Sequence, residues 1–554
     1  MRYLNIFISK TFIFNIVFFV AILYNPISGE FRVLNFIYYF YGGDFVKKFL
    51  KLIFSKKIIG ALFLILQVVL IFKTIDRIYS LPILIYGSAT VASILAILWE
   101  INRNVSPGFK IIWIAIIGTM PFFGILLYIY VHLDIFNFGI KKRITTINEN
   151  TKIYTKTNVA SLDEISQKEF KESGIFRYLH NYSDAPCFKN TSVKYFNLGE
   201  DMYAELIEDV KKAEKFIFIE YFIINENSYM WKNLEKILIE KAKNGVDVRV
   251  IYDGMGSITT ANHDFDNKIN KLGIKCRVFS PVKPFISSSH NNRDHRKIFV
   301  IDGKIAYTGG INFADEYINK KERFGHWKDS AVKLQGDAVN SFSLLFLKMW
   351  EFVSKEKIKY DDFLISHDVE ASNGYVSVFD DNPLDNERVS ENVYLHMIDN
   401  ANTYVYITTP YLILDDDLTD SLKFAAKRGV DVRITMPHIP DKWYAFMLAR
   451  TYYPELIKSG VKIYEYTPGF IHAKSTVSDD TRAFIGSANY DFRSLYLHYE
   501  CGVYIYNNSV ITEMVSDYKS TLEKCHLFTL EDYKSLKVIY RLIGRIIRFF
   551  APLM

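Results

Sequence analysis

The stretch HRKIFVID at residues 295–302 occurs a second time as HAKSTVSD at residues 472–479, and this repetition is the main evidence for the fold. In each copy one residue separates a His from a Lys, and an Asp follows five residues after the Lys. At the same distance downstream, each copy has a turn of small residues that ends in Asn, GGIN at 309–312 and GSAN at 486–489. Side chains two residues apart on a strand point to the same face, so each copy presents its His and Lys together.

The repetition extends well beyond the two motifs. The strand-like run FIFIEYF at 216–222 resembles YVYITTPY at 404–411, and AKNGVDVR at 242–249 resembles AKRGVDVR at 426–433. A Gly after the last helical Lys is typical of a helix end, and the VDVR phrase begins a strand. Strands that alternate with helices predict an α/β fold around a largely parallel sheet. We therefore expect two similar α/β halves in a pseudo-twofold arrangement, residues 191–370 and 371–538, with the site at their interface.

The two copies together supply the groups that phosphodiester exchange needs. A neutral imidazole can attack phosphorus and form a phosphohistidine, and a second, protonated imidazole can donate to the leaving oxygen. Lysine ammonium groups and Asn amides can hold the non-bridging oxygens. The Asp of each copy is expected to be structural, at the turn that ends the motif strand. The predicted motif residues are His295, Lys297, Asp302, His472, Lys474 and Asp479, with Asn312 and Asn489 as phosphate-binding residues.

A histidine nucleophile must be held in one tautomer, usually by a carboxylate on its other ring nitrogen. The candidates are Asp329, downstream of His295, and Glu500, downstream of His472. Because Lys and Asn side chains fill the electrostatic role, we expect neither a metal ion nor another cofactor.

Composition limits the partners. The net charge of +6 is small for 554 residues, which does not suggest nucleic acid binding but suits a surface beside anionic lipid. The four Cys are scattered and form no CxxC pair. They are interpreted as unpaired thiols of a reducing compartment, with no zinc site.

The first 133 residues are dominated by apolar side chains. Two runs, Leu81 to Trp99 and Ile111 to His132, are close to the ~20 residues that cross a ~30 Å hydrocarbon layer and predict a transmembrane hairpin. Two shorter runs, Thr11 to Tyr24 and Ile58 to Phe72, could span, lie in the interface or pack on the hairpin. The number of spans therefore stays open between two and four.

Basic residues suggest the orientation. Lysines cluster at 47–57, and KKR follows the hairpin at 141–143. If only the hairpin crosses, both clusters lie on one side, which the positive-inside tendency makes cytoplasmic. This predicts a multi-pass protein of the plasma membrane with its catalytic part in the cytoplasm. The remaining expected segments are an apolar N-terminal segment at 1–80, the hairpin at 81–133, a linker and lead-in at 134–190 and an amphipathic segment at 539–554. The last of these is expected to be a helix that either packs on the catalytic part or lies in the membrane interface.

At the motif residues the chain resembles the phospholipase D superfamily, and within it the bacterial cardiolipin synthases. The flanking phrases NRDHRKI at 292–298, TGGIN at 308–312 and GHWKD at 325–329 are similar to that family, as is the C-terminal RFFAPL at 548–553. Lys328 stands where the family commonly has Arg.

This resemblance implies a reaction. One phosphatidylglycerol would give its phosphatidyl group to the enzyme and release glycerol, and a second would accept it to make cardiolipin, with His295 favoured as nucleophile and His472 as general acid and base. The alternatives are a phospholipase D-type hydrolase and another phosphatidyltransferase such as a phosphatidylserine synthase. A nuclease fits the apolar hairpin poorly, and a silent lipid-binding scaffold would not need both motifs.

Overall fold

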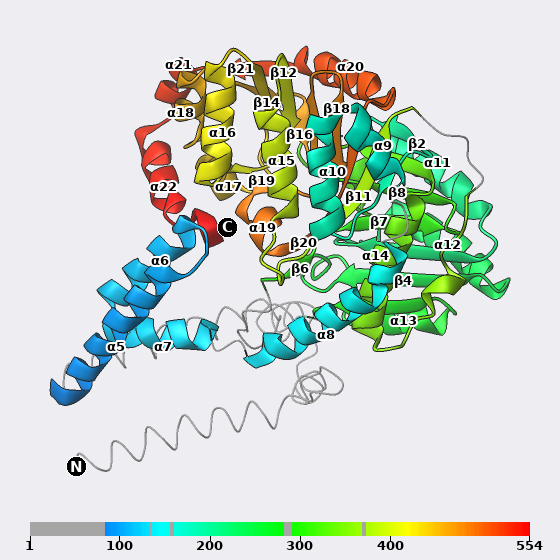
Figure 1. Cartoon of the computed structure of the whole chain (residues 1–554), viewed down its shortest axis with the longest axis horizontal. Helices are drawn as coiled ribbons and strands as arrows, with labels where there is room; N and C mark the ends of the chain where they lie inside the picture. Colours follow the sequence, from blue (N-terminus) through cyan, green and yellow to red (C-terminus); the bar gives the residue numbers. More distant parts are fainter. Residues whose placement is uncertain (1–82, 133–134, 156–159, 282–290, 368–372, 554) are drawn as a thin grey trace, which may run out of the picture. The chain divides into compact units, whose positions relative to one another are not determined.

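The computed structural model describes residues 83–132, 135–155, 160–281, 291–367 and 373–553 (Figure 1). The chain divides into two compact units, Met1–Ile94 and Leu95–Met554. The apolar segment at 1–80, with its runs Thr11 to Tyr24 and Ile58 to Phe72, and the loop at 282–290 lie outside the described residues.

The first half of the repeat forms a seven-stranded sheet in the order β2-β10-β8-β7-β3-β4-β5. Its strands are β2 (Thr191–Phe196), β3 (Phe216–Tyr221), β4 (Asp247–Asp253), β5 (Lys275–Phe279), β7 (Lys297–Ile301), β8 (Ile305–Gly309) and β10 (Ala331–Gly336). Its helices are α11 (Gly199–Lys211), α12 (Tyr229–Lys243), α13 (Phe265–Lys271) and α14 (Val339–Ser354).

The second half repeats this strand order as β11-β20-β18-β17-β12-β14-β15, with β1 and β21 added at the edges. Its strands are β1 (Cys187–Phe188), β11 (Tyr375–Asp381), β12 (Tyr404–Thr408), β14 (Asp431–Pro437), β15 (Lys462–Tyr466), β17 (Ser475–Ser478), β18 (Arg482–Gly486), β20 (His498–Tyr506) and β21 (Cys525–Phe528). Its helices are α15 (Val389–Asp399), α16 (Asp416–Lys427), α17 (Trp443–Ala449), α18 (Tyr453–Lys458), α19 (Phe492–Tyr496) and α20 (Val510–Leu522). Two similar α/β halves are thereby confirmed.

The expectation of a largely parallel sheet is wrong. In each half only three neighbouring strands run parallel, β3-β4-β5 and β12-β14-β15. The motif strands β7 and β17 lie antiparallel to β3 and β12 and return through tight hairpins to β8 and β18. The reason is local: Asp302 and Gly303 in one half, and Asp479 and Asp480 in the other, have positive φ and reverse the chain at once. The sheets are therefore mixed.

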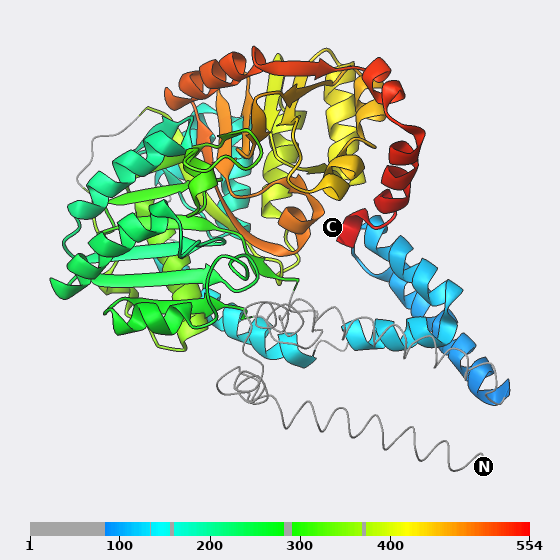
Figure 2. The same cartoon turned by 180° about the vertical axis from the view of Figure 1, so that it is seen from behind.

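The two sheets share one central core. Side chains of β3, β7 and α14 from the first half pack in the same apolar cluster as side chains of β11, β17, β20 and α20 from the second. Each half also has its own outer cluster, beneath α11 and α12 in one and beneath α15 and α16 in the other. Figures 1 and 2 show the first half in green and the second in yellow to orange, side by side in both views. Burial of the shared cluster fixes the halves face to face.

Three short strand pairings complete the contacts, and two of them cross between the halves. β6 (Arg293–Asp294) pairs in parallel with the start of β20, and β9 (His326–Lys328) pairs in parallel with β16 (Gly469–Ile471). β13 (Leu412–Ile413) pairs with β19 (Tyr490–Asp491) inside the second half. Each crossing pair lies immediately before a motif His, so the backbone positions both histidines across the interface.

The apolar N-terminal region forms shorter helices than expected. α5 (Ile83–Asn102) covers most of the first predicted span, but the second, Ile111 to His132, is not one helix. It divides into α6 (Pro107–Thr119) and α7 (Pro121–His132), because Pro121 lacks the N–H that would continue the helical hydrogen bonds. Among the described residues, no helix has both the length and the apolar character to cross a membrane.

Residues 144–170, a polar part of the segment expected as linker and lead-in, are mostly helical where the structure describes them. α8 (Ile135–Thr151) packs on α14, where Arg143 donates to the carbonyl of Glu351 at 3.0 Å. α9 (Ala160–Lys168) and α10 (Phe170–Tyr182) follow, and Ile165, Phe176 and Leu179 are buried in the core of the second half. Polar composition suggested a linker because these helices bury only one narrow face.

The C-terminal segment forms α21 (Leu530–Ser535) and the amphipathic α22 (Val538–Arg548). α22 packs on α17 at Gly544, where a Cβ would lie only 2.9 Å from the carbonyl of Met447. Most of its apolar side chains nevertheless face outward, among them Val538, Leu542 and Ile546. The chain then ends against α19 and the start of α6, where Pro552 meets Gly108.

Candidate active site

The two motif histidines are placed by backbone hydrogen bonds that cross between the halves. His295 N donates to the carbonyl of Tyr499 at 2.9 Å, and His472 N donates to the carbonyl of Lys328 at 2.7 Å. Tyr499 and Lys328 each come directly before a predicted orienting carboxylate. The arrangement is symmetric and brings both motifs to the interface.

The side chains are paired crosswise as well. His295 Nδ1 lies 2.8 Å from Oε1 of Glu500, and His472 Nδ1 lies 2.7 Å from Oδ2 of Asp329. Both histidines are 7% exposed, and both carboxylates are fully buried. Each carboxylate therefore serves the histidine of the other half. The sequence identified the carboxylates but not this exchange of partners.

Small residues of the two turns support the carboxylates. Ser487 Oγ donates to Oε2 of Glu500 at 2.5 Å. A Cβ on Gly310 would lie 2.1 Å from Oδ1 of Asp329, so no larger residue fits there. The motif turns GGIN and GSAN thus position the carboxylates closely against the sheet.

Both motif lysines are 1% exposed beside the histidines. Each ammonium group donates to the carbonyl of the His in its own motif, and Nζ of Lys474 also lies 2.9 Å from Nδ1 of His472. Burial lowers the pKa of Lys297 to about 8 and that of Lys474 to about 7. The site therefore holds two cations that are close to losing their protons.

Burial also lowers the pKa of both motif histidines. It lowers the pKa of His295 well below its ordinary value, although Glu500 acts in the opposite direction. Burial and the neighbouring Lys474 lower the pKa of His472 to about 4. Both imidazoles are consequently neutral near pH 7 before an anion binds. A neutral imidazole suits a nucleophile. An imidazole that acts as proton donor must gain its proton when the anion binds.

The predicted phosphate-binding amides differ from each other. Asn312 is internally bonded: its Oδ1 accepts from Ile223 N at 3.1 Å, and its Nδ2 donates to the hydroxyl of Tyr317 at 2.8 Å. Asn489 is 5% exposed, and its Oδ1 has no hydrogen-bond partner among the described residues. The two amides are thus held differently. Phosphate binding by Asn312 and by Asn489 remains a prediction.

The two motif aspartates lie at the far end of the strands from the histidines. Asp302 accepts hydrogen bonds from the backbone N–H groups of residues 214, 215 and 216, at 2.7–2.9 Å. Asp479 does the same for residues 402, 403 and 404, at 2.7–3.0 Å. They anchor the start of the neighbouring strand, β3 or β12, and touch no catalytic group in these contacts.

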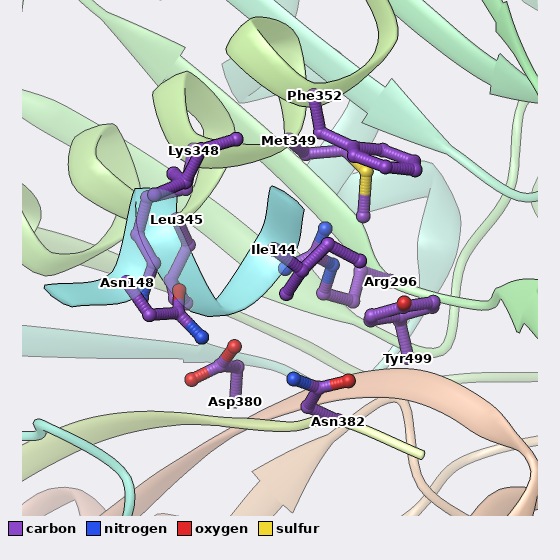
Figure 3. A pocket seen from close by; sticks show the side chains of 11 residues that line it. Ile144, Asn148, Arg296, Leu345, Lys348, Met349, Phe352, Asp380, Asn382 and Tyr499 are labelled. Carbon is purple, nitrogen blue, oxygen red and sulfur yellow. The ribbon is translucent and has the colours of Figure 1, made fainter. Parts of the chain in front are cut away.

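Arg296, between His295 and Lys297, points to the opposite face of the motif strand. It forms an ion pair with Glu220 at 2.6 Å and lines a cavity of about 30 Å³ between α8 and α14 (Figure 3). Asp380, Asn382 and Tyr499 gather at the same cavity. These polar side chains lie on the side of the motif strand opposite His295.

Cys501 is also buried, and burial raises the pKa of its thiol to about 11, which favours a structural thiol over a reactive one.

One residue of the site was missed by sequence reasoning. His498 begins β20 and lies two residues before Glu500, with its ring centroid 5.5 Å from that of His295. The signal was present as an extra His in the phrase HYE at 498–500, but no spacing rule relates it to the motif.

Comparisons with known proteins identify the family of the chain. A family model described as "Cardiolipin synthase, PLD-like domain" matches residues 206–350 and 394–523. A cardiolipin synthase of Alkalihalophilus pseudofirmus is 34% identical over 462 residues, which is 82% of this chain and 90% of the relative. A cardiolipin synthase 2 of Bacillus anthracis is 31% identical over 454 residues, 82% of this chain and 88% of the relative.

One further relative and one solved structure are similar to the chain. An uncharacterised protein of Streptococcus mutans is 44% identical over 461 residues, 83% of this chain and 99% of the relative. Among solved structures, a phosphatidylserine synthase of Haemophilus influenzae matches with a TM-score of 0.51 at 14% identity, covering 69% of this chain and 97% of that one. At this identity the match supports the two-half fold alone.

Proposed function

The chain belongs to the cardiolipin synthases with phospholipase D-like domains and is a phosphatidyltransferase, and we propose that it transfers a phosphatidyl group from one phosphatidylglycerol to another. The products are cardiolipin and glycerol. The observation that carries the proposal is the pair of buried His–carboxylate contacts, one on each side of the interface. Two oriented imidazoles at one site are what a double displacement at phosphorus requires.

In the first step, the neutral Nε2 of His295 attacks phosphorus of the donor lipid. The P–O bond to the glycerol headgroup breaks, and His472 gives its Nε2 proton to the departing oxygen. Glu500 holds the other nitrogen of His295 and stabilises the positive charge that forms on the ring. The phosphatidyl group is then covalently bound to His295.

In the second step, the roles of His472 reverse. It removes a proton from a hydroxyl of the second phosphatidylglycerol, whose oxygen attacks phosphorus. The P–N bond to His295 breaks, and the electron pair returns to the imidazole. Cardiolipin leaves, His472 is again protonated, and the site is ready for a new donor.

The lysines provide the charge that this reaction needs. In the proposed reaction, Lys297 and Lys474, both buried beside the motif histidines, attract the anionic phosphodiester. A bound phosphodiester also favours the protonated form of His472, which by itself has a pKa of about 4. Substrate binding thereby supplies the condition for the acid step.

The site works at a membrane surface in this proposal. Both substrates carry two acyl chains and do not diffuse freely through water. The apolar side chains of α22 that face outward lie beside Arg541 and Arg545, a combination that suits an anionic lipid surface. Whether the chain crosses the bilayer, and with which side inward, stays a prediction of the N-terminal sequence.

The test is a product analysis. Purified protein is incubated with vesicles that contain phosphatidylglycerol, and the lipids and released glycerol are measured. Cardiolipin and glycerol in equal amounts are the expected products. Phosphatidic acid as the main product would identify a hydrolase instead and refute the proposal.

A further inference from the structure

His498 is a buried histidine whose ring nitrogens make no hydrogen bond among the described residues, although Nδ1 lies at ion-pair distance from Glu500. It is 9% exposed, and neither ring nitrogen has a hydrogen-bond partner among the described residues. Its Nδ1 lies 3.7 Å from Oε1 of Glu500, which is beyond hydrogen-bonding distance. Buried polar groups are nearly always hydrogen-bonded, because an unpaired group loses its contacts with water and gains nothing in return. A ligand in the site is therefore a natural partner for this ring.

The position is chemically asymmetric between the halves. His498 lies two residues before Glu500, and Trp327 lies two residues before Asp329. The two rings occupy matching places, with centroids 5.5 Å from His295 and 5.4 Å from His472. An indole has one donor and no acceptor, whereas an imidazole can act as either. Each ring thus carries a buried nitrogen without a hydrogen-bond partner among the described residues, but only the ring next to His295 can also accept a hydrogen bond or gain a proton.

We propose that His498 is a substrate-binding residue that donates a hydrogen bond to the phosphatidyl group held by His295. This inference rests on the proposed function and on His295 as the nucleophile. In a displacement at phosphorus, the leaving alcohol departs opposite the nucleophile, toward His472. A ring beside His295 therefore contacts the oxygens of the part that is retained, not the alcohol that is exchanged.

The experiment compares His498→Phe, His498→Gln and His498→Asn with the wild type on phosphatidylglycerol vesicles. Phe keeps a ring but no donor, Gln places an amide N–H near the position of Nε2, and Asn places one near Nδ1. His498→Phe should lower kcat/KM by about 10- to 100-fold and lower the yield of trapped phosphatidyl-enzyme in parallel. One of the amide variants should recover most of the loss, and it identifies the donating nitrogen. The ratio of cardiolipin to phosphatidic acid should not change.

A matched control and the stability of each variant complete the design. His526→Phe changes an exposed histidine that pairs with Asp532 on the edge strand β21, which β12, β14 and β15 separate from the motif strand β17, and it should leave kcat/KM unaltered. Melting temperatures show whether a variant is merely less folded. Activity of His498→Phe within about threefold of wild type would overturn the proposal. So would an equal loss in all three variants that follows a lower melting temperature, or a changed product ratio with normal labelling of His295.

A metal-binding role is an alternative that the same variants exclude or establish. Ligand atoms of His295, His498 and Glu500 all lie within 4.8 Å of one another, a donor set that zinc accepts. If Zn²⁺ inhibits the wild type but not His498→Phe, and both turn over equally in chelator, His498 is a metal ligand and the proposal is wrong.

A soluble chromogenic phosphodiester, assayed in parallel, keeps the test of His498 separate from the lipid reaction. Wild-type turnover of that compound without cardiolipin formation would reject the proposed function while the role of His498 could still be measured.

Discussion

His295 Nδ1 lies 2.8 Å from Oε1 of Glu500, a carboxylate 205 residues further along the chain and on the other half of the repeat. Its counterpart, Asp329 with His472, crosses the interface in the opposite direction at 2.7 Å. Neither half alone contains a histidine together with the carboxylate that orients it. The active site is thus a property of the paired halves.

Removing either histidine should abolish turnover. His295→Ala and His472→Ala are each expected to lower kcat on phosphatidylglycerol by at least ~10³-fold, because the nucleophile and its proton partner act in one coupled step. Trapping of the lipid–enzyme intermediate should fail in His295→Ala and succeed in the wild type. Label recovered on His472 would reverse the two roles.

The crossed carboxylates make a separate prediction. Glu500→Gln should slow the first step, in which His295 is labelled as glycerol leaves, by about 100-fold, since an amide no longer holds the required tautomer. Asp329→Asn should slow both this step and the transfer to the second lipid by about 100-fold, because His472 handles a proton in each. Rapid-quench measurement of His295 labelling with glycerol release follows the first step, and cardiolipin formed from the trapped intermediate follows the second. A Glu500→Gln enzyme that forms the intermediate at the wild-type rate would contradict the observed pairing.

The motif aspartates should matter for stability more than for chemistry. Asp302→Ala leaves the backbone N–H groups of residues 214–216, where β3 begins, without an acceptor and should cost about 3 kcal/mol of unfolding free energy. The folded fraction should keep a kcat close to wild type. Denaturant unfolding with active-site titration measures both quantities, and normal stability with lost kcat would instead assign the residue to catalysis.

Activity should decline on the alkaline side as the lysines lose their protons. The free-enzyme pKa values of about 7 for Lys474 and about 8 for Lys297 predict that kcat/KM falls as pH rises through this range, since only the charged forms attract the phosphodiester. Bound substrate stabilises those charges, so the decline in kcat should occur at higher pH. Lys474→Arg should move the decline in kcat/KM to higher pH, even if the maximum value of kcat/KM is lower. An unchanged profile would show that Lys474 does not control it.

The outward apolar face of α22 gives a prediction about lipid. Ile546→Asp should weaken binding to phosphatidylglycerol vesicles by at least ~10-fold, because an exposed apolar contact is replaced by a charge that the surface repels. Phe170→Asp is the control, since Phe170 is also exposed but lies on α10. Co-sedimentation with vesicles measures both. Equal binding of the two variants would exclude α22 from the lipid contact.

Much of the fold could be predicted because the sequence repeats itself in the two halves. The phrases that end in Gly245 and Gly429 predicted the ends of two equivalent helices, and α12 and α16 end at Lys243 and Lys427, just before those glycines. Where local signals compete, prediction was weaker. Pro121 divides the second apolar run into α6 and α7, and the polar stretch at 144–170 is helical because α8 is stabilised by packing on α14.

Sequence periodicity predicted which groups gather at the site: the repeated motif supplies two histidines and two lysines, because alternation along a strand ties each His to its Lys, and two carboxylates downstream were candidates to orient the histidines. The pairing of these groups follows from the tertiary structure. Asp329 and Glu500 exchange histidines because β9 and β20 lie against the strand segments that precede the other motif, a contact between residues far apart in the chain. It also brought His498 beside His295, which no local spacing encodes. Hydrogen bonds and burial across the interface, rather than sequence distance, set which side chains meet.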